Sequence, residues 1–331
     1  MQLDSLLNAV RATVKRHELE PGVYARYLWQ NPEGKRKMGA NEYGCADAAN
    51  ILYILGDMPR DLQIRKSHVE QLQSFQDPQT GLFWEGSHHI LHCTAHCIAA
   101  LELFDAGPKY SLSGLEKYKA EGMLEDLLEN LDWQNAAWSE AHQGAGIFAA
   151  MILTGNASAQ WQDRYFGWLD ANTDPEYGMS KAGTLQIGEY AKCGHLNGWF
   201  HYLFNYNFAH RPFPRVNTLI DTVIDLYKNN ELSDAFGKSV GFREIDWVFT
   251  LNRATMQSGY RREEAKNLML DFAKKYILYL ASLDYEADDR WNDLHMLFGA
   301  VCALAELQIA LPGMLNSLYP LKQILDRRPF I

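Results

Sequence analysis

Apolar residues recur at every third or fourth position along most of this chain. The period is clear in the segments LLNAVRATV, LEDLLENL, VNTLIDTVIDLY and LMLDFAKKYILYLASL. This spacing is typical of an amphipathic α-helix, whereas a half-buried strand alternates apolar and polar residues. We find neither convincing alternating runs nor hairpin dipeptides between such runs. The sequence therefore predicts an all-α protein.

The predicted helices are of two kinds, and the two kinds alternate along the chain. One kind is amphipathic and charged and covers residues 3–18, 60–76, 113–131, 158–170, 214–229 and 262–283. The other kind is rich in small and apolar residues on nearly every face and covers residues 41–55, 88–104, 138–154, 188–206, 242–256 and 291–310. A helix that is apolar all round has to be buried, and amphipathic helices can cover it. We therefore expect an inner and an outer layer.

The six apolar helices can be aligned on a common level near their starts. The residues at this level are Asp47, His96, Ala145, His195, Asp246 and His295, with spacings of 49, 49, 50, 51 and 49 residues. A period near 50 predicts a repeat architecture. The expected fold is an (α/α)6 toroid, in which six outer–inner helical hairpins form a single domain over residues 1–331 and a helix near 316–327 closes the ring. A linear solenoid is the alternative, but its repeats normally keep stronger similarity and polar terminal caps.

Turn motifs lead into several of the apolar helices. The segments QDPQTGLFWEG, TDPEYGMSKAG and QNPEGKRKMGANEY each place Pro after Asp or Asn and a Gly soon afterwards, which is turn chemistry. With the period near 50, these motifs resemble those of the six-hairpin glycosidases. Residues 76–84 are also similar to the turns of terpenoid cyclase and prenyltransferase toroids. The resemblance implies a toroid but no single chemistry, because these families include hydrolases, lyases, epimerases, cyclases and transferases.

Polar residues concentrate in the first two turns of the apolar helices, which predicts a polar cup at one rim of the ring. Glycoside hydrolysis needs two carboxyl groups that flank the sugar. We expect a carbohydrate-active enzyme, most simply a glycoside hydrolase, with Asp47 and Asp246 as the acid pair and Glu140 and Glu189 as reserves. Expected substrate contacts are Glu42, Tyr43, Trp84, His92, Trp138, His142, Tyr190, Arg243, Trp291 and His295.

Proton transfer by imidazole and phenol groups is the alternative chemistry of this cup. A lyase or epimerase would use the side chains of His96, His142, His195, Tyr43 and Tyr190 to move a proton beside a substrate carboxylate held by Arg243. An enzyme similar to terpenoid cyclases or prenyltransferases, and a toroid that binds a ligand without turning it over, also stay open.

The segment HCTAHC at residues 92–97 raises the question of a metal ion. His92 and His96 are four residues apart on one side of a helix and could share an ion. Zinc sites occur in prenyltransferase toroids, but this chain lacks a matching Asp, Cys and His trio. We expect no metal and no cofactor, because separate helices of a wide ring do not easily supply a third ligand. His92 and His96 should point into the cup near Asp47 and His142.

Composition narrows the classes of partner. A net charge of −10 argues against nucleic acid, whose phosphates the average surface would repel. No apolar run reaches the roughly 18 residues of a membrane span, and the N-terminal segment lacks the features of a secretion signal. Five cysteines, an odd number, favour reduced thiols. We expect a cytoplasmic enzyme for a small molecule or an oligosaccharide, without nucleic-acid or membrane partners.

Overall fold

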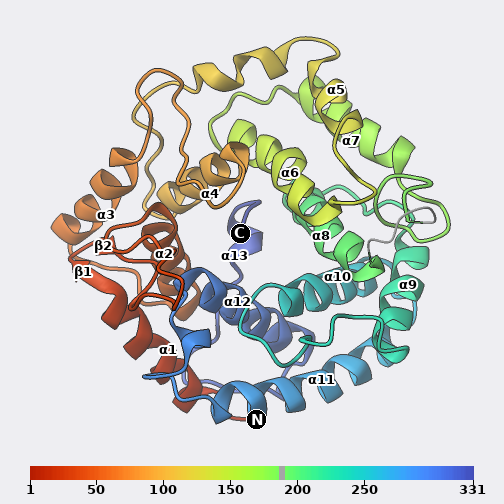
Figure 1. The fold of residues 1–331 in the computed structure, drawn as a ribbon. Helices are drawn as coiled ribbons and strands as arrows, with labels where there is room; N and C mark the ends of the chain where they lie inside the picture. The colour runs from red at the N-terminus through yellow and green to blue at the C-terminus, as the bar shows by residue number, and fades with distance from the viewer. Residues whose placement is uncertain (186–190) are drawn as a thin grey trace.

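The structure is a computed structural model that describes residues 1–185 and 191–331. It is mostly helical, so the all-α prediction is confirmed. A short antiparallel pair of strands, β1 (Glu18–Glu20) and β2 (Val23–Tyr24), interrupts the helices near the N-terminus. Figure 1 shows the helices in two concentric layers around the C-terminal end of the chain. No helix in the described ranges is both long and apolar enough to cross a membrane.

The inner layer consists of the apolar helices of the sequence pattern. They are α2 (Glu42–Leu55), α4 (Ile90–Glu102), α6 (Ala137–Leu153), α8 (Lys192–Phe208), α10 (Arg243–Ser258) and α12 (Leu294–Ala310). Each of them packs against the next one along the chain, and α12 packs against α2 (Figure 1). The side chains of these helices are buried on most faces, which explains their lack of a polar stripe.

The outer layer covers this ring. It contains α1 (Asp4–His17), α3 (Leu62–Ser74), η1 (Ser113–Lys119), α5 (Met123–Glu129), α7 (Ala159–Asn172), α9 (Val216–Lys228) and α11 (Arg262–Ser282). The predicted helix over residues 113–131 is divided into η1 and α5. Gly122 lies at the break with a positive φ of 82°, which ends a right-handed helix.

The C-terminal segment differs from the prediction of a closing helix over residues 316–327. Only α13 (Ile324–Arg327) is helical there, because Pro320 cannot lie inside a helix. The backbone of Asn316 instead pairs with the N-terminal segment, where the Leu3 amide donates to the Asn316 carbonyl at 2.9 Å. After α13 the chain enters the middle of the ring, where Phe330 and Ile331 are buried (Figure 1).

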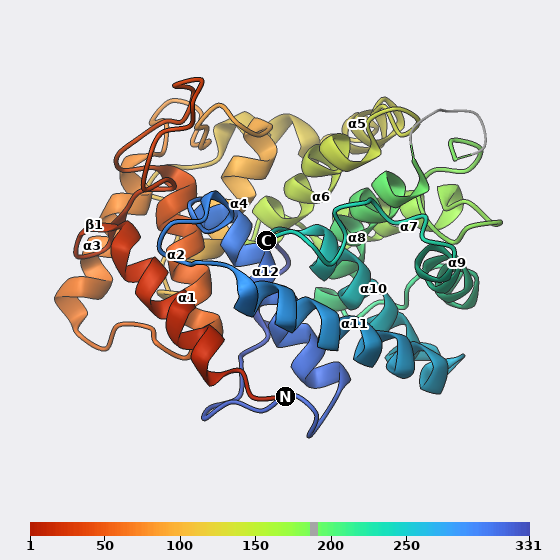
Figure 2. The same cartoon turned by 60° about the horizontal axis from the view of Figure 1, so that its bottom comes forward.

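Capping residues fix where two of the inner helices begin. The side chain of Asn41 accepts a hydrogen bond from the Gly44 amide at the start of α2, and that of Asp293 accepts one from the His295 amide at the start of α12. The segment between β2 and α2 lies at one rim of the ring, and the N-terminus lies at the opposite rim (Figure 2). The short 3₁₀ helix η2 (Asp289–Trp291) precedes α12.

Candidate functional site

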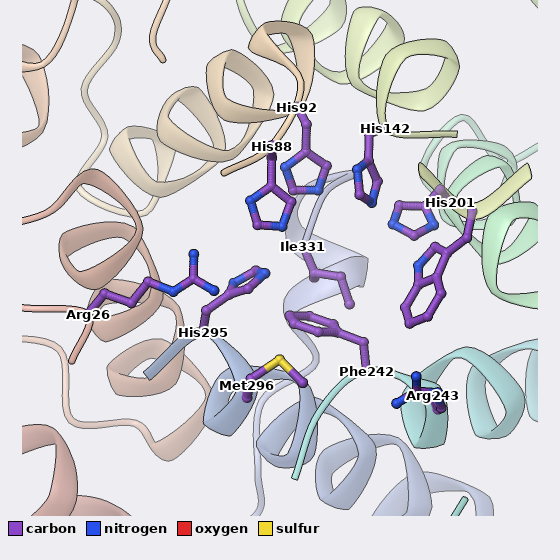
Figure 3. A pocket seen from close by; sticks show the side chains of 11 residues that line it. Arg26, His88, His92, His142, His201, Phe242, Arg243, His295, Met296 and Ile331 are labelled. Atoms are coloured by element: carbon purple, nitrogen blue, oxygen red, sulfur yellow. The ribbon is translucent and has the colours of Figure 1, made fainter. Parts of the chain in front are cut away.

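A cavity of about 160 Å³ lies in the middle of the inner ring. Most of its wall comes from the first turns of inner helices, so it lies where the sequence predicted a polar cup. Figure 3 shows the lining side chains, which are Arg26, His88, His92, Trp138, His142, His201, Phe242, Arg243, His295, Met296 and Ile331.

Histidine rings crowd one side of this cavity. The ring centroids of His92 and His142 are 4.4 Å apart, and those of His142 and His201 are 5.4 Å apart. His88 lies 4.9 Å from His92 and 5.1 Å from His295 by the same measure (Figure 3). Five imidazoles therefore face one small space.

Three of these rings form a set that we call the histidine triad: His92 of α4, His142 of α6 and His201 of α8. One ring nitrogen from each lies within 4.8 Å of the other two. From the sequence we expected that separate helices would not easily supply a third ligand for a metal ion. That geometric argument is wrong, because three consecutive inner helices bring their side chains to one point.

Hydrogen bonds orient two rings of the histidine triad. Nδ1 of His201 lies 2.9 Å from the carbonyl oxygen of Asn197, so Nδ1 carries the proton and donates it. Nδ1 of His92 is hydrogen-bonded to the hydroxyl of Tyr43. In both rings Nε2 is left for the cavity.

A second set, which we call the aspartate triad, lies beside the cavity and consists of Asp47 of α2, His96 of α4 and His295 of α12. Nε2 of His96 lies 2.8 Å from one carboxylate oxygen of Asp47. Nδ1 of His295 lies 3.2 Å from the other oxygen. Asp47 and His96 are fully buried, whereas His295 also lines the cavity.

Burial sets the charge of the imidazoles. It lowers the pKa of His201 and of His295 from 6.5 to about 4. Burial and the neighbouring imidazoles hold the pKa of His92 and of His142 well below the usual range. All four rings are therefore uncharged at neutral pH and keep a lone pair.

Asp47, unlike these histidines, is charged at neutral pH. Burial alone would raise the pKa of this carboxyl, but the interactions with His295 and His96 outweigh burial and hold its pKa below the usual range. The aspartate triad therefore holds an ionised carboxylate between two imidazole N–H donors.

Two arginines lie at the cavity, and only one has an anionic partner. Arg26 makes a two-pronged ion pair with Asp293, with N···O distances of 2.9 and 3.0 Å. Arg243 stacks over the ring of Trp138, with its guanidinium carbon 5.3 Å from the ring centroid. Within the described ranges, Arg243 forms no hydrogen bond or ion pair, so its charge is available to an anionic ligand.

Several residues predicted from the sequence gather at this site. His92, Trp138, His142, Arg243 and His295 line the cavity. Asp47 and His96 meet directly behind it, and the buried ring of Tyr43 stacks on His96 and His88. His92 and His96 thus lie near His142 and Asp47, as expected.

Other predicted residues lie elsewhere. Asp246 is buried outside the cavity wall, and burial, together with Glu244, raises its pKa well above the usual range. His195 is hydrogen-bonded to Ser180 at 3.0 Å, and Trp291 packs near Tyr285. None of the described lining residues is an aspartate or a glutamate, so neither Asp47 nor Asp246 lines the cavity.

Three further predicted residues, Glu42, Trp84 and Glu140, do not line the cavity. Glu42 is buried beside Cys97, and burial raises its pKa to about 8. Trp84 and Glu140 line an outer hollow that shares His88 and His142 with the cavity. Trp84 is 65% exposed there. Glu189 and Tyr190 lie outside the described residues.

Sequence reasoning missed several lining residues, among them His88, His201 and Arg26. His201 lies in the apolar run HLNGWFHYL, where it resembles a core residue, and Arg26 lies in an irregular segment before α2. The spacing between His195 and His201 was the available signal. His201 follows His195 by six residues, which is about 120° around the helix, so the two histidines cannot share the face that lines the cavity.

Comparison with protein-family models, with curated proteins and with solved structures finds no match to this chain.

Proposed function

We propose that this chain is an (α/α)6 toroid whose central cavity transfers a proton on a small substrate that carries a carboxylate, as a lyase or an epimerase. The toroid is supported by the alternation of inner and outer helices and by the packing of α12 against α2. The observation that carries the function is a cavity lined by uncharged imidazoles and by Arg243, with no acidic side chain among its described lining residues.

Arg243 is the group that would bind the substrate carboxylate. It has no anionic partner in the described ranges, and its stacking on Trp138 fixes the guanidinium plane. A planar guanidinium donates two parallel hydrogen bonds to a carboxylate. This places the carbon next to the carboxylate inside the cavity.

His295 is the proposed base. Its Nδ1–H donates to Asp47, so the lone pair is on Nε2, and the ring lines the cavity. The Nε2 atom takes the proton from the carbon beside the carboxylate, and the C–H electron pair passes into an enolate. In an epimerase the enolate carbon then takes back a proton on its other face, and in a lyase the electron pair expels the β-hydroxyl, which leaves as water after it is protonated. A substrate carboxylate in the cavity would raise the pKa of His295, because negative charge stabilises the imidazolium.

The size of the cavity limits the substrate. A volume of about 160 Å³ is below the roughly 300 Å³ at which typical small-molecule pockets begin. The cavity suits the acidic end of a sugar acid, and a longer molecule would extend into the adjoining outer hollow. Exposed Trp84 in the adjoining outer hollow offers a stacking surface for the rest of the molecule. This observation keeps carbohydrate as the proposed substrate class, while the glycoside hydrolase loses support because neither Asp47 nor Asp246 lines the cavity.

Solvent deuterium exchange tests this proposal. The protein is incubated in D₂O with a panel of aldonates and uronates, and loss of the α-proton signal is followed by NMR. A lyase also produces an unsaturated acid that absorbs in the ultraviolet, whereas an epimerase does not.

Matched variants sharpen the test. His295→Asn should lower the rate about 10²- to 10⁴-fold, the usual loss on removal of a general base. His195→Asn, outside the cavity, is the matched control and should keep the rate. Absence of exchange across the panel, or equal rates for the two variants, would contradict the proposal.

A further inference from the structure

We propose that the histidine triad, His92, His142 and His201, binds one divalent transition-metal ion, with an open coordination position that faces the cavity. Zinc is the simplest such ion. This inference deepens the proposed function, on which its catalytic role rests, because the ion would face the same cavity as Arg243 and His295.

The ligand geometry is the first support. Zinc–nitrogen bonds of about 2.0–2.1 Å at tetrahedral angles place ligand nitrogens about 3.3 Å apart. The three nitrogens of the triad already lie within 4.8 Å of one another. His142 is only half-buried and has no hydrogen-bond partner in the described ranges, so its ring can turn to complete the set. Rotation of side chains is sufficient, and the helices need not move.

The second support is the fixed orientation of the rings. Histidines that bind metals through one nitrogen commonly donate the other N–H to a carbonyl or another polar group. His201 donates to the Asn197 carbonyl, and His92 bonds to the Tyr43 hydroxyl. Both contacts occupy Nδ1, so Nε2 is the nitrogen of each ring that can bind an ion, in His92 through the tautomer whose Nδ1–H donates to the Tyr43 hydroxyl.

The free ring nitrogens are the third support. The three imidazoles face one another without a hydrogen bond between them in the described structure, so a ring nitrogen of each is left for a cation. The positive charge of Arg26 is matched by Asp293. The buried Asp47 carboxylate lies behind His96, whose ring centroid is 6.1 Å from that of His92. Arg243 adds positive charge across the cavity, so the free ring nitrogens, rather than the net charge of the surroundings, are what favours the ion.

The aspartate triad is a weaker candidate for the same role, although its donor atoms are also close together. Nε2 of His96 and Nδ1 of His295 are both at hydrogen-bond distance from Asp47, at 2.8 and 3.2 Å. Those nitrogens therefore carry protons and are satisfied without an ion. We assign this set to holding His295 in position.

A site of three histidines with an open position is typical of catalytic zinc. When bound, such an ion supplies Lewis acidity, which would polarise a substrate carboxylate and stabilise the enolate. The cavity wall on the other side carries Arg243 and His295, so one substrate can contact all three groups (Figure 3).

Metal titration tests the proposal on the whole chain without an added tag. Chelator-treated protein is titrated with Co²⁺ and, separately, with Zn²⁺, and bound metal is counted by elemental analysis after gel filtration. We expect one equivalent per chain and the visible absorption of low-symmetry Co²⁺. His142→Asn and His201→Gln should lose the bound equivalent, and circular dichroism shows whether each variant is folded. His142 is the safer position, because it is half-buried.

Two further variants complete the design. Tyr43→Phe keeps the ring but removes the hydroxyl beside His92, and should weaken binding about 10- to 100-fold with one equivalent retained. His68→Gln removes a buried histidine outside the cavity and should bind as the parent does.

Each outcome decides the matter. No bound metal in the parent protein, or full binding by folded His142→Asn, overturns the site. Two equivalents, one of them lost in Asp47→Asn, overturn the assignment of a single ion. Metal binding without deuterium exchange leaves this site standing and removes the proposed function. Deuterium exchange that depends on His295, in protein shown to bind no metal, leaves the proposed function standing and removes this metal site.

Discussion

The two triads lie side by side on the same inner ring but differ in how their polar groups are satisfied. In the aspartate triad a buried carboxylate accepts from two imidazoles, at 2.8 and 3.2 Å. In the histidine triad three imidazoles meet with no acid among them. In the first set both ring nitrogens that face Asp47 are hydrogen-bonded to it, although Nδ1 of His96 has no partner in the described structure. The second set leaves ring nitrogens to the cavity. Proximity of donor atoms alone therefore does not define a metal site; the direction and occupancy of each nitrogen do.

The surroundings of the triads explain the same difference. Asp47 is fully buried and closed off by inner helices, so its partners must come from the protein. His142 is half-buried and lines both the cavity and the outer hollow. Hydrogen bonds between buried groups, as around Asp47, hold side chains in place, and a set that is open to a ligand serves binding.

Acid should produce the largest change, because it acts on both triads at once. Burial lowers the pKa of His201 and of His295, one in each triad, from 6.5 to about 4, and does the same to His17 and His68 in other parts of the core. The unfolded chain then binds more protons than the folded one. Stability is therefore complete above about pH 6.5 and is lost as the pH falls toward 4.

The expected size of the acid effect is large. Acidification through the pKa of each of these histidines lowers the free energy of unfolding by at most about 3 kcal/mol. Urea denaturation of the metal-free protein should therefore show a much lower midpoint at pH 5 than at pH 7.5. An unchanged or higher midpoint at pH 5 would show that the imidazoles are not held uncharged.

The loss of Asp47 should be the next largest effect. Asp47→Ala leaves the N–H groups of His96 and His295 without their acceptor, and breaking a buried network of this kind costs about 3–5 kcal/mol. His142→Ala removes a half-buried ring with no hydrogen bond in the described ranges and should cost about 1 kcal/mol or less. Urea denaturation of both variants in chelator measures the difference. Equal losses would erase the distinction between the triads.

Much of this comparison could be expected from the sequence. The period of apolar residues predicted the helices, and the spacing near 50 placed Asp47, His96 and His295 at one level, where they do meet. The same alignment placed His195 and Asp246 at that level, but neither lines the cavity. An alignment fixes the height of a residue along a helix and leaves the rotation of the helix undetermined.

Rotation depends on packing that a single sequence does not reveal. On α8 the face toward the cavity carries His201, whereas His195 contacts Ser180 in the preceding segment. Arg26 reaches the cavity from an irregular segment, and Ile331 reaches it because the C-terminal residues enter the ring. These contacts join positions far apart in the chain and have no periodic signal.

Metal should stabilise the parent protein through the histidine triad alone. A ligand that binds only the folded state at 100 times its dissociation constant adds about 2.7 kcal/mol to the free energy of unfolding. We expect Zn²⁺ to raise the thermal midpoint of the parent and of Tyr43→Phe, the latter at higher zinc concentration. His142→Asn should show no rise. A rise in His142→Asn equal to that in the parent would place the stabilising ion elsewhere.

The most local expected effect comes from separating two helices of the histidine triad. Gly198 of α8 packs against the start of α6, where an added Cβ would lie 2.5 Å from the carbonyl oxygen of Ala137. Gly198→Ala should therefore push α8 away from α6 and cost about 1–3 kcal/mol as overpacking. His201 would move with α8 away from His142 on α6, whereas the aspartate triad, on α2, α4 and α12, would keep its distances.

Two measurements distinguish the two triads: the metal affinity of the histidine triad, and the NMR signals of the imidazole N–H groups in the aspartate triad. Gly198→Ala should bind Co²⁺ more weakly, while the N–H signals of His96 and His295 stay at their parent positions. Because the two triads share α4, a shift of the His96 signal would mean that the strain crosses that helix. The aspartate triad would then respond to the packing of α8, and the two sets would have to be treated as one coupled network.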